Sequence, residues 1–293
     1  MTTHKTLQFR SQADGLTIHG DMWIPEAKPI AALQIAHGLA EHCRRYDRVA
    51  RQLTDHGFIV YAHDHRGHGR SLTGPGALGD AGKGGWNGLV SDVVQHNAAI
   101  RNAHPGLPVY MLGHSMGSFA AQQVLLDHSR ELDGAILSGS TDFAMVAQLV
   151  ASTGQAPSFD AYNAAFAPNR TAFDWLSRDE EEVDAYIDDP LCGFDAPEAF
   201  IADMMAAAPQ LGDPDRVAGI RPDLPLYVFS GDKDPLNAGL ALLHSLTSRY
   251  EAAGLKDITT KYYADGRHEM LNETNHHEVA ADLIGWLESH LPG

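Results

Sequence analysis

Short apolar runs alternate with amphipathic segments along most of the chain. Runs of about four to eight apolar residues between turn residues indicate buried strands, and apolar positions three or four apart indicate helices. The first two runs meet at Asp14-Gly15, which is typical of a hairpin. Later runs alternate with helical segments, which favours an α/β fold with a mostly parallel sheet and helices on both faces. The pattern predicts strands at residues 7–11, 16–24, 30–36, 58–62, 109–112, 134–138, 226–230 and 258–263.

The alternation stops between residues 141 and 222, where no run is typical of a strand. We therefore predict a core in two parts, residues 1–140 and 223–293, with a helical insertion at 141–222. An acidic run from Asp179 to Asp184 is typical of a solvated helix face. The large apolar residues of the insertion could line a pocket or form a small core of their own. They are Phe143, Met145, Leu149, Phe166, Phe200, Met204 and Met205.

Composition and charge narrow the class of protein. The 293 residues are 44% hydrophobic and 20% charged, which is typical of a globular chain. The formal net charge of −17 argues against a nucleic-acid partner and against electrostatic attachment to an anionic membrane. Cys43 and Cys192 lie too far apart in sequence to suggest a disulfide framework. Residues 1–10 lack the apolar run of a signal peptide, so we expect a cytoplasmic protein.

The strongest chemical motif lies where the fifth predicted strand ends. There Gly113-His114-Ser115-Met116-Gly117 separates an apolar run from a helix-forming segment. A serine at such a turn is a nucleophile elbow, which needs small residues two positions before and after the serine. The turn exposes the serine hydroxyl and directs the Met116 N–H toward a developing oxyanion. A glycine-rich turn of any α/β protein can share this short pattern. Whether Ser115 is a nucleophile therefore depends on whether the chain supplies a histidine and an acid to act with it.

A glycine-containing loop, His37 to His42, follows the third predicted strand. It could direct the backbone N–H of Leu39 at Ser115 as a second oxyanion donor, or it could be an ordinary turn between a strand and a helix.

A second loop, His63 to Ser71, is dense in histidine. Metal ligation by His63, His65 and His68 is one interpretation, but two arginines in the loop oppose a cation. Hydrogen bonding of this loop beside the elbow is the favoured interpretation. We therefore predict no metal and no organic cofactor.

A serine becomes nucleophilic when an imidazole takes its proton and a carboxylate orients that imidazole. Both partners are available after the insertion, in the chain order serine, acid, histidine that is typical of α/β-hydrolases. His268 is the histidine at a strand end in this part of the chain. Asp232 and Asp234 both follow the seventh predicted strand, and on spacing alone either could be the acid.

These motifs resemble those of the monoacylglycerol lipase and lysophospholipase group of α/β-hydrolases, the serine aminopeptidase-like hydrolases. Together they span nearly the whole chain outside the insertion. The residues that carry the resemblance are His37-Gly38-Leu39-Ala40-Glu41-His42 with Arg45-Tyr46, Asp64-His65-Arg66-Gly67-His68-Gly69-Arg70-Ser71, Gly113-His114-Ser115-Met116-Gly117, Gly231-Asp232-Lys233-Asp234-Pro235 and Gly266-Arg267-His268-Glu269. In the insertion, residues 173–179 and 189–194 resemble bacterial members labelled lysophospholipases.

The resemblance implies an eight-stranded α/β-hydrolase fold with a helical cap. It selects Asp234 as the acid and Leu39 and Met116 as the oxyanion donors. It also implies a serine hydrolase that cleaves esters of single-chain lipids, most closely monoacylglycerol. A lysophospholipase, a short-chain carboxylesterase and a non-catalytic binding protein of the same fold are the alternatives. An apolar cap tip could contact a membrane transiently, although the negative charge opposes anionic lipid.

Overall fold

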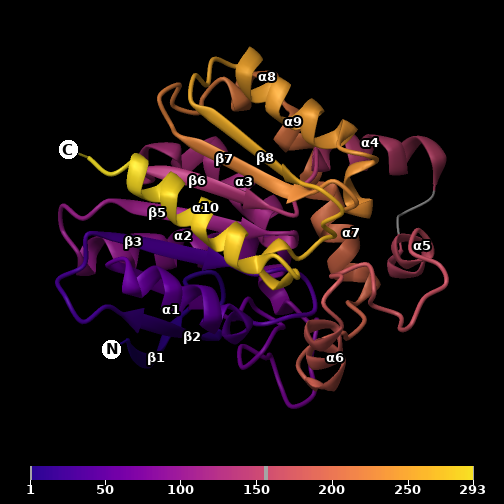
Figure 1. The fold of residues 1–293 in the computed structure, drawn as a ribbon, viewed down its shortest axis with the longest axis horizontal. Coiled ribbons are helices and arrows are strands. Elements are labelled where there is room, and N and C mark those ends of the chain that lie inside the picture. Colours follow the sequence, from indigo (N-terminus) through magenta and orange to yellow (C-terminus); the bar gives the residue numbers. More distant parts are fainter. Residues whose placement is uncertain (1, 155–157, 293) are drawn as a thin grey trace.

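An eight-stranded sheet crosses the molecule in the order β1-β2-β4-β3-β5-β6-β7-β8 (Figure 1). The structure is a computed structural model that describes residues 2–154 and 158–292. β1 is antiparallel to β2, and β2 is antiparallel to β4, whereas the other neighbours are parallel. The strands are β1 Thr3–Arg10, β2 Thr17–Ile24, β3 Ala31–Ala36, β4 Phe58–His63, β5 Val109–His114, β6 Gly134–Ser138, β7 Leu226–Gly231 and β8 Ile258–Tyr263.

All eight predicted strands are present, and the largest difference is at the start of β1. This strand begins at Thr3 instead of Leu7. Its polar first half pairs residue by residue with β2, from Thr3 opposite Ile24 to Arg10 opposite Thr17. Pairing across the hairpin extends a strand that an apolar pattern alone does not reveal.

Helices cover both faces of the sheet, and each face has its own apolar core. α1 and α10 pack on one face, and α2, α3 and α9 pack on the other. The helices of the core are α1 Asp47–Asp55, α2 Gly85–Ala103, α3 Met116–His128, α9 Ala241–Ala252 and α10 His276–Ser289.

Helix α2 begins four residues earlier than the apolar spacing predicts. The spacing begins at Leu89, whereas the helix begins at Gly85. The backbone N–H of Trp86 donates to Oδ2 of Asp203 at 2.6 Å, so a carboxylate from the insertion satisfies one of the free N–H groups at the helix start.

Most of the helices between β6 and β7 form a cap at the carboxyl ends of the parallel strands (Figure 1). They fall within the predicted insertion, residues 141–222. The domain limits themselves, 1–140, 141–222 and 223–293, stay a prediction. The cap helices are α4 Phe143–Thr153, α5 Phe159–Ala164, α6 Glu180–Asp188 and α7 Glu198–Ala207. Helix α8, Pro214–Val217, lies outside the cap, where Arg216 pairs with Asp127 in the last turn of α3.

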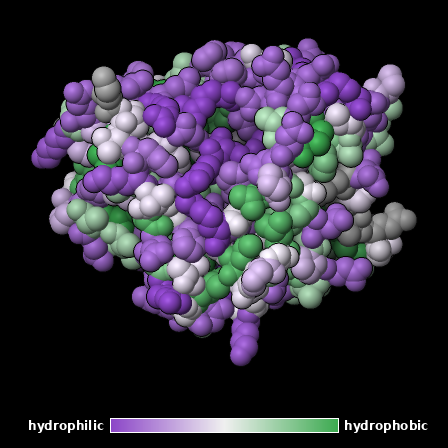
Figure 2. All heavy atoms as spheres, turned by 90° about the horizontal axis from the view of Figure 1, so that it is seen from below, coloured by the Kyte–Doolittle hydropathy of each residue, from purple (hydrophilic) through white to green (hydrophobic). Residues whose placement is uncertain are grey.

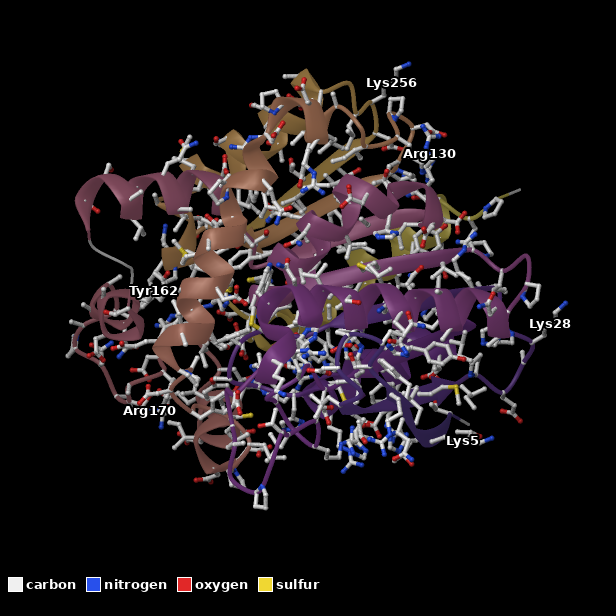
Figure 3. The ribbon with its side chains drawn as sticks, turned by 180° about the vertical axis from the view of Figure 1, so that it is seen from behind. Lys5, Lys28, Arg130, Tyr162, Arg170 and Lys256 are labelled. Atoms are coloured by element: carbon white, nitrogen blue, oxygen red, sulfur yellow. The ribbon has the colours of Figure 1, made fainter. Side chains whose placement is uncertain are left out.

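Hydrophilic residues predominate on the face of the molecule shown in Figure 2, where apolar residues form a narrow band. Lys5, Lys28, Arg130 and Lys256 lie on the side of the molecule away from the cap (Figure 3). Among the described residues, no helix is both long enough and apolar enough to cross a membrane.

Candidate active site

Ser115 lies at a strained turn between β5 and α3. Its backbone has φ 51° and ψ −122°, a conformation that is costly for a residue with a side chain. Glycine is required on both sides. A Cβ at Gly113 would lie 2.5 Å from the carbonyl oxygen of Gly117, and a Cβ at Gly117 would lie 2.1 Å from that of Ala36. Strain of this kind, held by close packing, is what a nucleophile elbow requires.

His268 and Asp234 meet at the carboxyl ends of β7 and β8. Nδ1 of His268 lies 3.0 Å from Oδ2 of Asp234, and both side chains are buried. Burial disfavours the charged imidazole, but the charge and hydrogen bond of Asp234, together with the charges of Glu269 and Glu41, raise the pKa of His268 above its ordinary value. Oδ2 of Asp234 also accepts a hydrogen bond from the Ser230 hydroxyl at 3.0 Å. The carboxylate is therefore fixed in the orientation in which it holds the imidazole.

Asp232, the other candidate acid, faces away from His268. Its carboxylate accepts the backbone N–H of Asp265 at 2.8 Å and lies 3.6 Å from Nζ of Lys233. Of the two aspartates that spacing left open, the structure brings Asp234 to the histidine.

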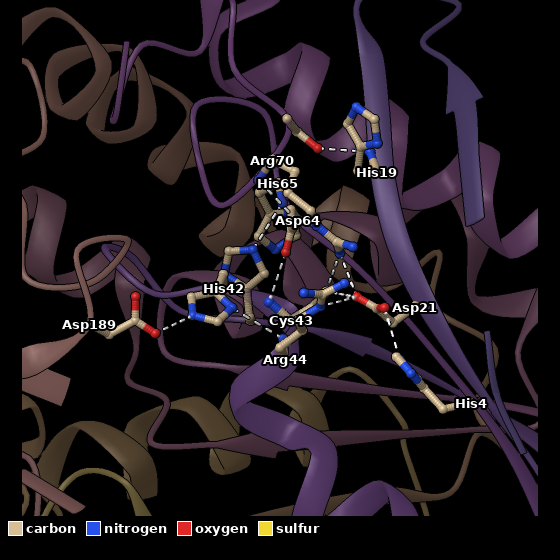
Figure 4. A network of polar contacts seen from close by, with 12 residues as sticks. His4, His19, Asp21, His42, Cys43, Arg44, Asp64, His65, Arg70 and Asp189 are labelled. Atoms are coloured by element: carbon tan, nitrogen blue, oxygen red, sulfur yellow. Dashed lines mark hydrogen bonds and ion pairs between the residues drawn. The ribbon is translucent and has the colours of Figure 1, made fainter. Parts of the chain in front are cut away.

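A polar network joins the segment after β3 to the loop after β4 (Figure 4). The Cys43 N–H donates to Oδ1 of Asp64 at 3.0 Å, and Nε of Arg70 donates to Oδ2 at 2.7 Å. Earlier in the segment after β3, a Cβ at Gly38 would lie only 3.2 Å from Cβ of Ser115.

Because the backbone of this segment runs directly past the serine, Leu39 lines the same cavity as Ser115 and Met116. This is where two oxyanion donors must lie, and donation by the N–H groups of Leu39 and Met116 stays a prediction.

Two cavities meet at Ser115. The larger, about 530 Å³, extends under the cap and is mostly apolar. The smaller, about 30 Å³, is lined by Glu41, His114, Glu269 and His268 as well as Ser115. The residues that line both are Leu39, Ser115 and Trp175. Ser115 therefore lies between a mostly apolar compartment and a smaller, more polar one, which we call the polar cavity.

The structure separates the predicted pocket residues into two groups. Phe143, Leu149, Met204 and Met205 line the larger cavity. The other three, Met145, Phe166 and Phe200, lie outside it.

Met145 points away from the cavity on the outer face of α4 and is 41% exposed. Phe200 is buried between α7 and the core, with its ring 6.4 Å from that of Trp86. Phe166 also lies outside, beneath the guanidinium of Arg267 at 4.4 Å. For these three residues, exposure or packing within the fold accounts for the apolar side chain.

A buried ion network forms one wall of the small cavity. Arg45 donates to both carboxylate oxygens of Glu269, at 2.6 and 2.7 Å, and to Glu41 at 2.9 Å. Burial disfavours the charged form of Glu41, but Arg45, His114, His37 and the Gly38 N–H together outweigh it and lower the pKa of Glu41 to about 2. Arg45 also lowers the pKa of Glu269 against the effect of burial. Two carboxylates thus share one guanidinium, which leaves this wall negative.

The histidine-rich loop is packed in the interior beside the loop after β3. Within the described part of the structure, the two ring nitrogens of His65 have no hydrogen-bond partner. Its backbone N–H donates to Nε2 of His37 at 2.9 Å. The ring centroids of His63 and His65 are 5.0 Å apart, and those of His65 and His68 are 6.4 Å apart. Among the described residues, these three do not form a group of metal ligands. The three rings pack as a buried aromatic cluster, an arrangement that neither interpretation of the sequence names.

One group in the described part of the chain does bring three possible ligand atoms within 4.8 Å of one another: His42, Asp189 and Cys192. Here the Arg44 backbone N–H donates to Nδ1 of His42 at 3.3 Å, so the proton of the neutral ring lies on Nε2. That proton is directed at Asp189, 2.8 Å away (Figure 4). A metal at Nε2 requires the opposite tautomer. The group instead forms a hydrogen bond between the core and the cap.

Three features of the site were not predicted: the cover that Trp175 forms on His268, the pairing of Arg45 with Glu269, and the wall that Tyr186 adds. Arg45 and Glu269 lie in the motifs that carry the family resemblance, and Trp175 lies in the cap segment 173–179. The motifs therefore mark these residues in the sequence, but they do not show which residues they contact in the folded chain.

Comparison with known proteins agrees with this geometry. A family model described as serine aminopeptidase, S33, matches residues 27–275. The chain belongs to this family. It is 33% identical to a monoacylglycerol lipase of Mycolicibacterium smegmatis, over 94% of this chain and 95% of that protein. It is 30% identical to a monoglyceride lipase of Mus musculus, over 92% of this chain and 86% of that protein.

Solved structures share the fold of this family member. A thermostable carboxyl esterase from Bacillus coagulans, in complex with glycerol, superposes with a TM-score of 0.86 at 24% identity, over 99% of each chain. The predicted α/β-hydrolase fold, an eight-stranded and mostly parallel sheet with a helical cap, is confirmed.

Proposed function

We propose that this protein hydrolyses the ester bond of monoacylglycerols through an acyl-enzyme on Ser115. One observation carries the proposal: the serine lies between a mostly apolar cavity of about 530 Å³ and a more polar one of about 30 Å³ that two carboxylates line. A single-chain lipid ester has the same division, with a long apolar chain on one side of the carbonyl and a small polar alcohol on the other. The relatives named monoacylglycerol and monoglyceride lipases support this substrate class.

The first step is attack of Ser115 Oγ on the ester carbonyl. His268 accepts the hydroxyl proton on Nε2, while Asp234 holds Nδ1 at 3.0 Å and stabilises the imidazolium that forms. The carbonyl oxygen gains negative charge, which the N–H groups of Leu39 and Met116 stabilise by hydrogen bonds. The tetrahedral intermediate collapses when His268 returns the proton to the leaving alcohol.

A water molecule then repeats the cycle on the acyl-enzyme. His268 takes a proton from the water, the hydroxide attacks the acyl carbonyl, and Ser115 leaves with that proton restored. The products are a fatty acid and an alcohol, and the proposed chemistry uses only groups of this chain.

The polar cavity favours glycerol over a phosphate-containing head group. Glu41 and Glu269 present two carboxylates to this cavity, against the single guanidinium of Arg45. The phosphate next to the glycerol of a lysophospholipid is negative, so these carboxylates repel it. We therefore place monoacylglycerol above lysophospholipid as the substrate.

We propose that helix α4 of the cap contacts a lipid surface transiently. Residues 143–154 carry no charged side chain, although the whole chain has a net charge of −17. Met145 and Leu149 are 41% and 59% exposed on this helix, and Leu149 also lines the apolar cavity. The exposed face thus continues into the acyl compartment. The location in the cell stays a prediction, and a cytoplasmic protein is the one that the sequence favours.

The direct test is hydrolysis by the purified protein of two series of substrates. One is p-nitrophenyl esters from two to sixteen carbons, and the other is a monoacylglycerol beside a lysophosphatidylcholine of equal chain length. We expect activity to peak at medium or long chains and to favour the glycerol ester. Activity confined to the shortest esters would contradict a lipid substrate and point to a short-chain carboxylesterase.

A further inference from the structure

Trp175 comes from the cap yet covers the predicted catalytic histidine. Its ring centroid lies 4.9 Å from that of His268 and 5.3 Å from that of Tyr162. The side chain is 4% exposed. Figure 3 shows Tyr162 within the cap, so the two rings connect the cap to the reacting centre. Trp175 also lines both the apolar and the polar cavity.

The segment that carries Trp175 is hydrogen-bonded to the histidine loop by the two residues that follow Trp175. The Glu269 backbone N–H donates to the carbonyl oxygen of Leu176 at 2.7 Å, and the Ser177 hydroxyl donates to that of Asn272 at 2.8 Å.

The next residue of the segment continues this pattern. Nε of Arg178 donates to Glu273 at 2.9 Å, and the same carboxylate accepts the backbone N–H of Arg267 at 3.0 Å. Arg267 in turn donates to the carbonyl oxygens of Asp174 and Ser177. Residues 174–178 are therefore held to residues 267–273 at several points. This part of the cap forms a fixed wall of the site, in contrast to the exposed face of α4.

A fixed ring between two compartments limits what either can accept. Behind Trp175, the polar cavity of about 30 Å³ is closed by Leu176 and Tyr186 from the cap and by Glu41 and Glu269 from the core. A buried space of this size holds about two water-sized groups, since one water needs about 10–15 Å³ measured in the same way. The hydroxyl groups of a small alcohol suit this space, whereas an aromatic or branched alcohol does not.

We infer that Trp175 is the residue that sets the size of the leaving alcohol. Its indole separates the acyl compartment from the alcohol compartment and closes the latter over His268. This inference deepens the proposed function, because it explains why a glycerol ester is preferred to esters of larger alcohols. It requires only that the protein hydrolyses esters, so it can be tested even if monoacylglycerol proves to be the wrong substrate.

The test compares decanoate esters of alcohols of increasing size: methyl, glyceryl, benzyl and naphthylmethyl. For each variant we take the ratio of kcat/KM for the naphthylmethyl ester to kcat/KM for the methyl ester. Both esters use the same histidine, so a change in the basicity of His268 cancels in the ratio. In Trp175→Val we expect the ratio to rise about ten-fold or more, the scale on which pocket size discriminates substrates. Trp175→Phe should give a smaller rise.

A matched control lies in the other compartment. Met205 lines the apolar cavity and does not line the polar one. Met205→Ala should change the preferred acyl chain length and leave the alcohol ratio within about two-fold of the wild type. The folded state of each variant is checked by its thermal melting curve.

If Trp175→Val folds and its ratio equals that of the wild type, the inference is wrong. If Trp175→Val does not fold, an unchanged ratio in Trp175→Phe overturns the inference. Failure of the proposed function has a different signature. In that case the wild type would cleave methyl decanoate but not the glyceryl ester, while the ratio would still respond to Trp175.

Discussion

At the scale of single residues, the proposed catalysis depends on which aspartate contacts His268. Spacing leaves Asp232 and Asp234 equal, since both follow β7, and the family resemblance selects the second. The two aspartates have different surroundings in the structure. Asp234 is buried and bonded to His268, whereas Asp232 bonds to the backbone of Asp265 nearer the surface.

The two aspartates therefore make a matched pair of variants. Asp234→Asn removes the charge that stabilises the imidazolium and allows the wrong tautomer, so we expect kcat to fall on the order of 10⁴-fold. It also removes a cause of the raised pKa of His268, so the acid limb of the kcat/KM profile should move to lower pH. Asp232→Asn should leave kcat within a few-fold of the wild type. Equal losses in the two variants would show that the acid has been misassigned.

Residue roles that depend on tertiary partners were beyond the sequence. Phe200 and Met204 lie one helical turn apart on α7, yet Phe200 packs against Trp86 while Met204 lines the cavity. Both are large, apolar and buried, so no pattern of hydropathy separates them. Trp175 was visible within a cap segment, but its neighbour His268 is 93 positions away. Only the folded chain brings the two rings together.

At the scale of elements, the sequence was more informative. Seven of the strands have limits that differ from the prediction by a few residues at most, and the hairpin between β1 and β2 follows from Asp14-Gly15. The elbow was readable because its glycines have a steric cause: no larger residue fits at Gly113 or Gly117. The start of α2 was not readable, because its cap, Asp203, belongs to another part of the chain.

Helix α4 carries the prediction at this scale. Burial of a leucine in an apolar environment is worth about 1.5–3 kcal/mol, so Leu149→Asp should weaken binding to neutral phosphatidylcholine vesicles about ten-fold or more. Hydrolysis of a soluble short-chain ester should change far less. Ile30→Asp is the control, since Ile30 is also exposed, at 43%, but lies just before β3, at the opposite end of the sheet from the cap. Co-sedimentation with vesicles measures binding, and an equal response of the two variants would refute contact through α4.

At the scale of the whole molecule, an unusual number of histidines are buried. Desolvation lowers the pKa of His68 to about 3 and of His96 and His114 to about 4. It also lowers the pKa of His37, and it places that of His63 and His65 well below the ordinary value. In the unfolded chain the same rings titrate near pH 6.5.

The sign of the resulting pH dependence follows from linkage. Below about pH 6.5 the unfolded chain binds protons that these buried rings reject, so the free energy of unfolding falls as the pH decreases toward 4. His268 opposes this trend, because Asp234 and two glutamates raise its pKa against the effect of burial, but it is one ring against six. We expect the melting temperature to be highest above pH 6.5 and to fall steadily between pH 6.5 and 4.

A pair of histidine variants isolates this effect from general acid denaturation. His96 is buried and His277 is exposed. His96→Gln should reduce the slope of unfolding free energy against pH in this window, whereas His277→Gln should leave it unchanged. A slope that is the same in His96→Gln as in the wild type would contradict the histidine origin of the acid sensitivity.

The central claim is that Ser115 is an activated nucleophile. The most direct measurement is reaction of the native protein with a fluorophosphonate probe, followed by intact mass analysis and peptide mapping. The account predicts one label per chain, on Ser115, with loss of esterase activity in step with labelling. In Ser115→Ala we expect no label and a loss of activity of about 10⁵-fold or more. Labelling of another residue, or full ester hydrolysis by Ser115→Ala, would contradict the account.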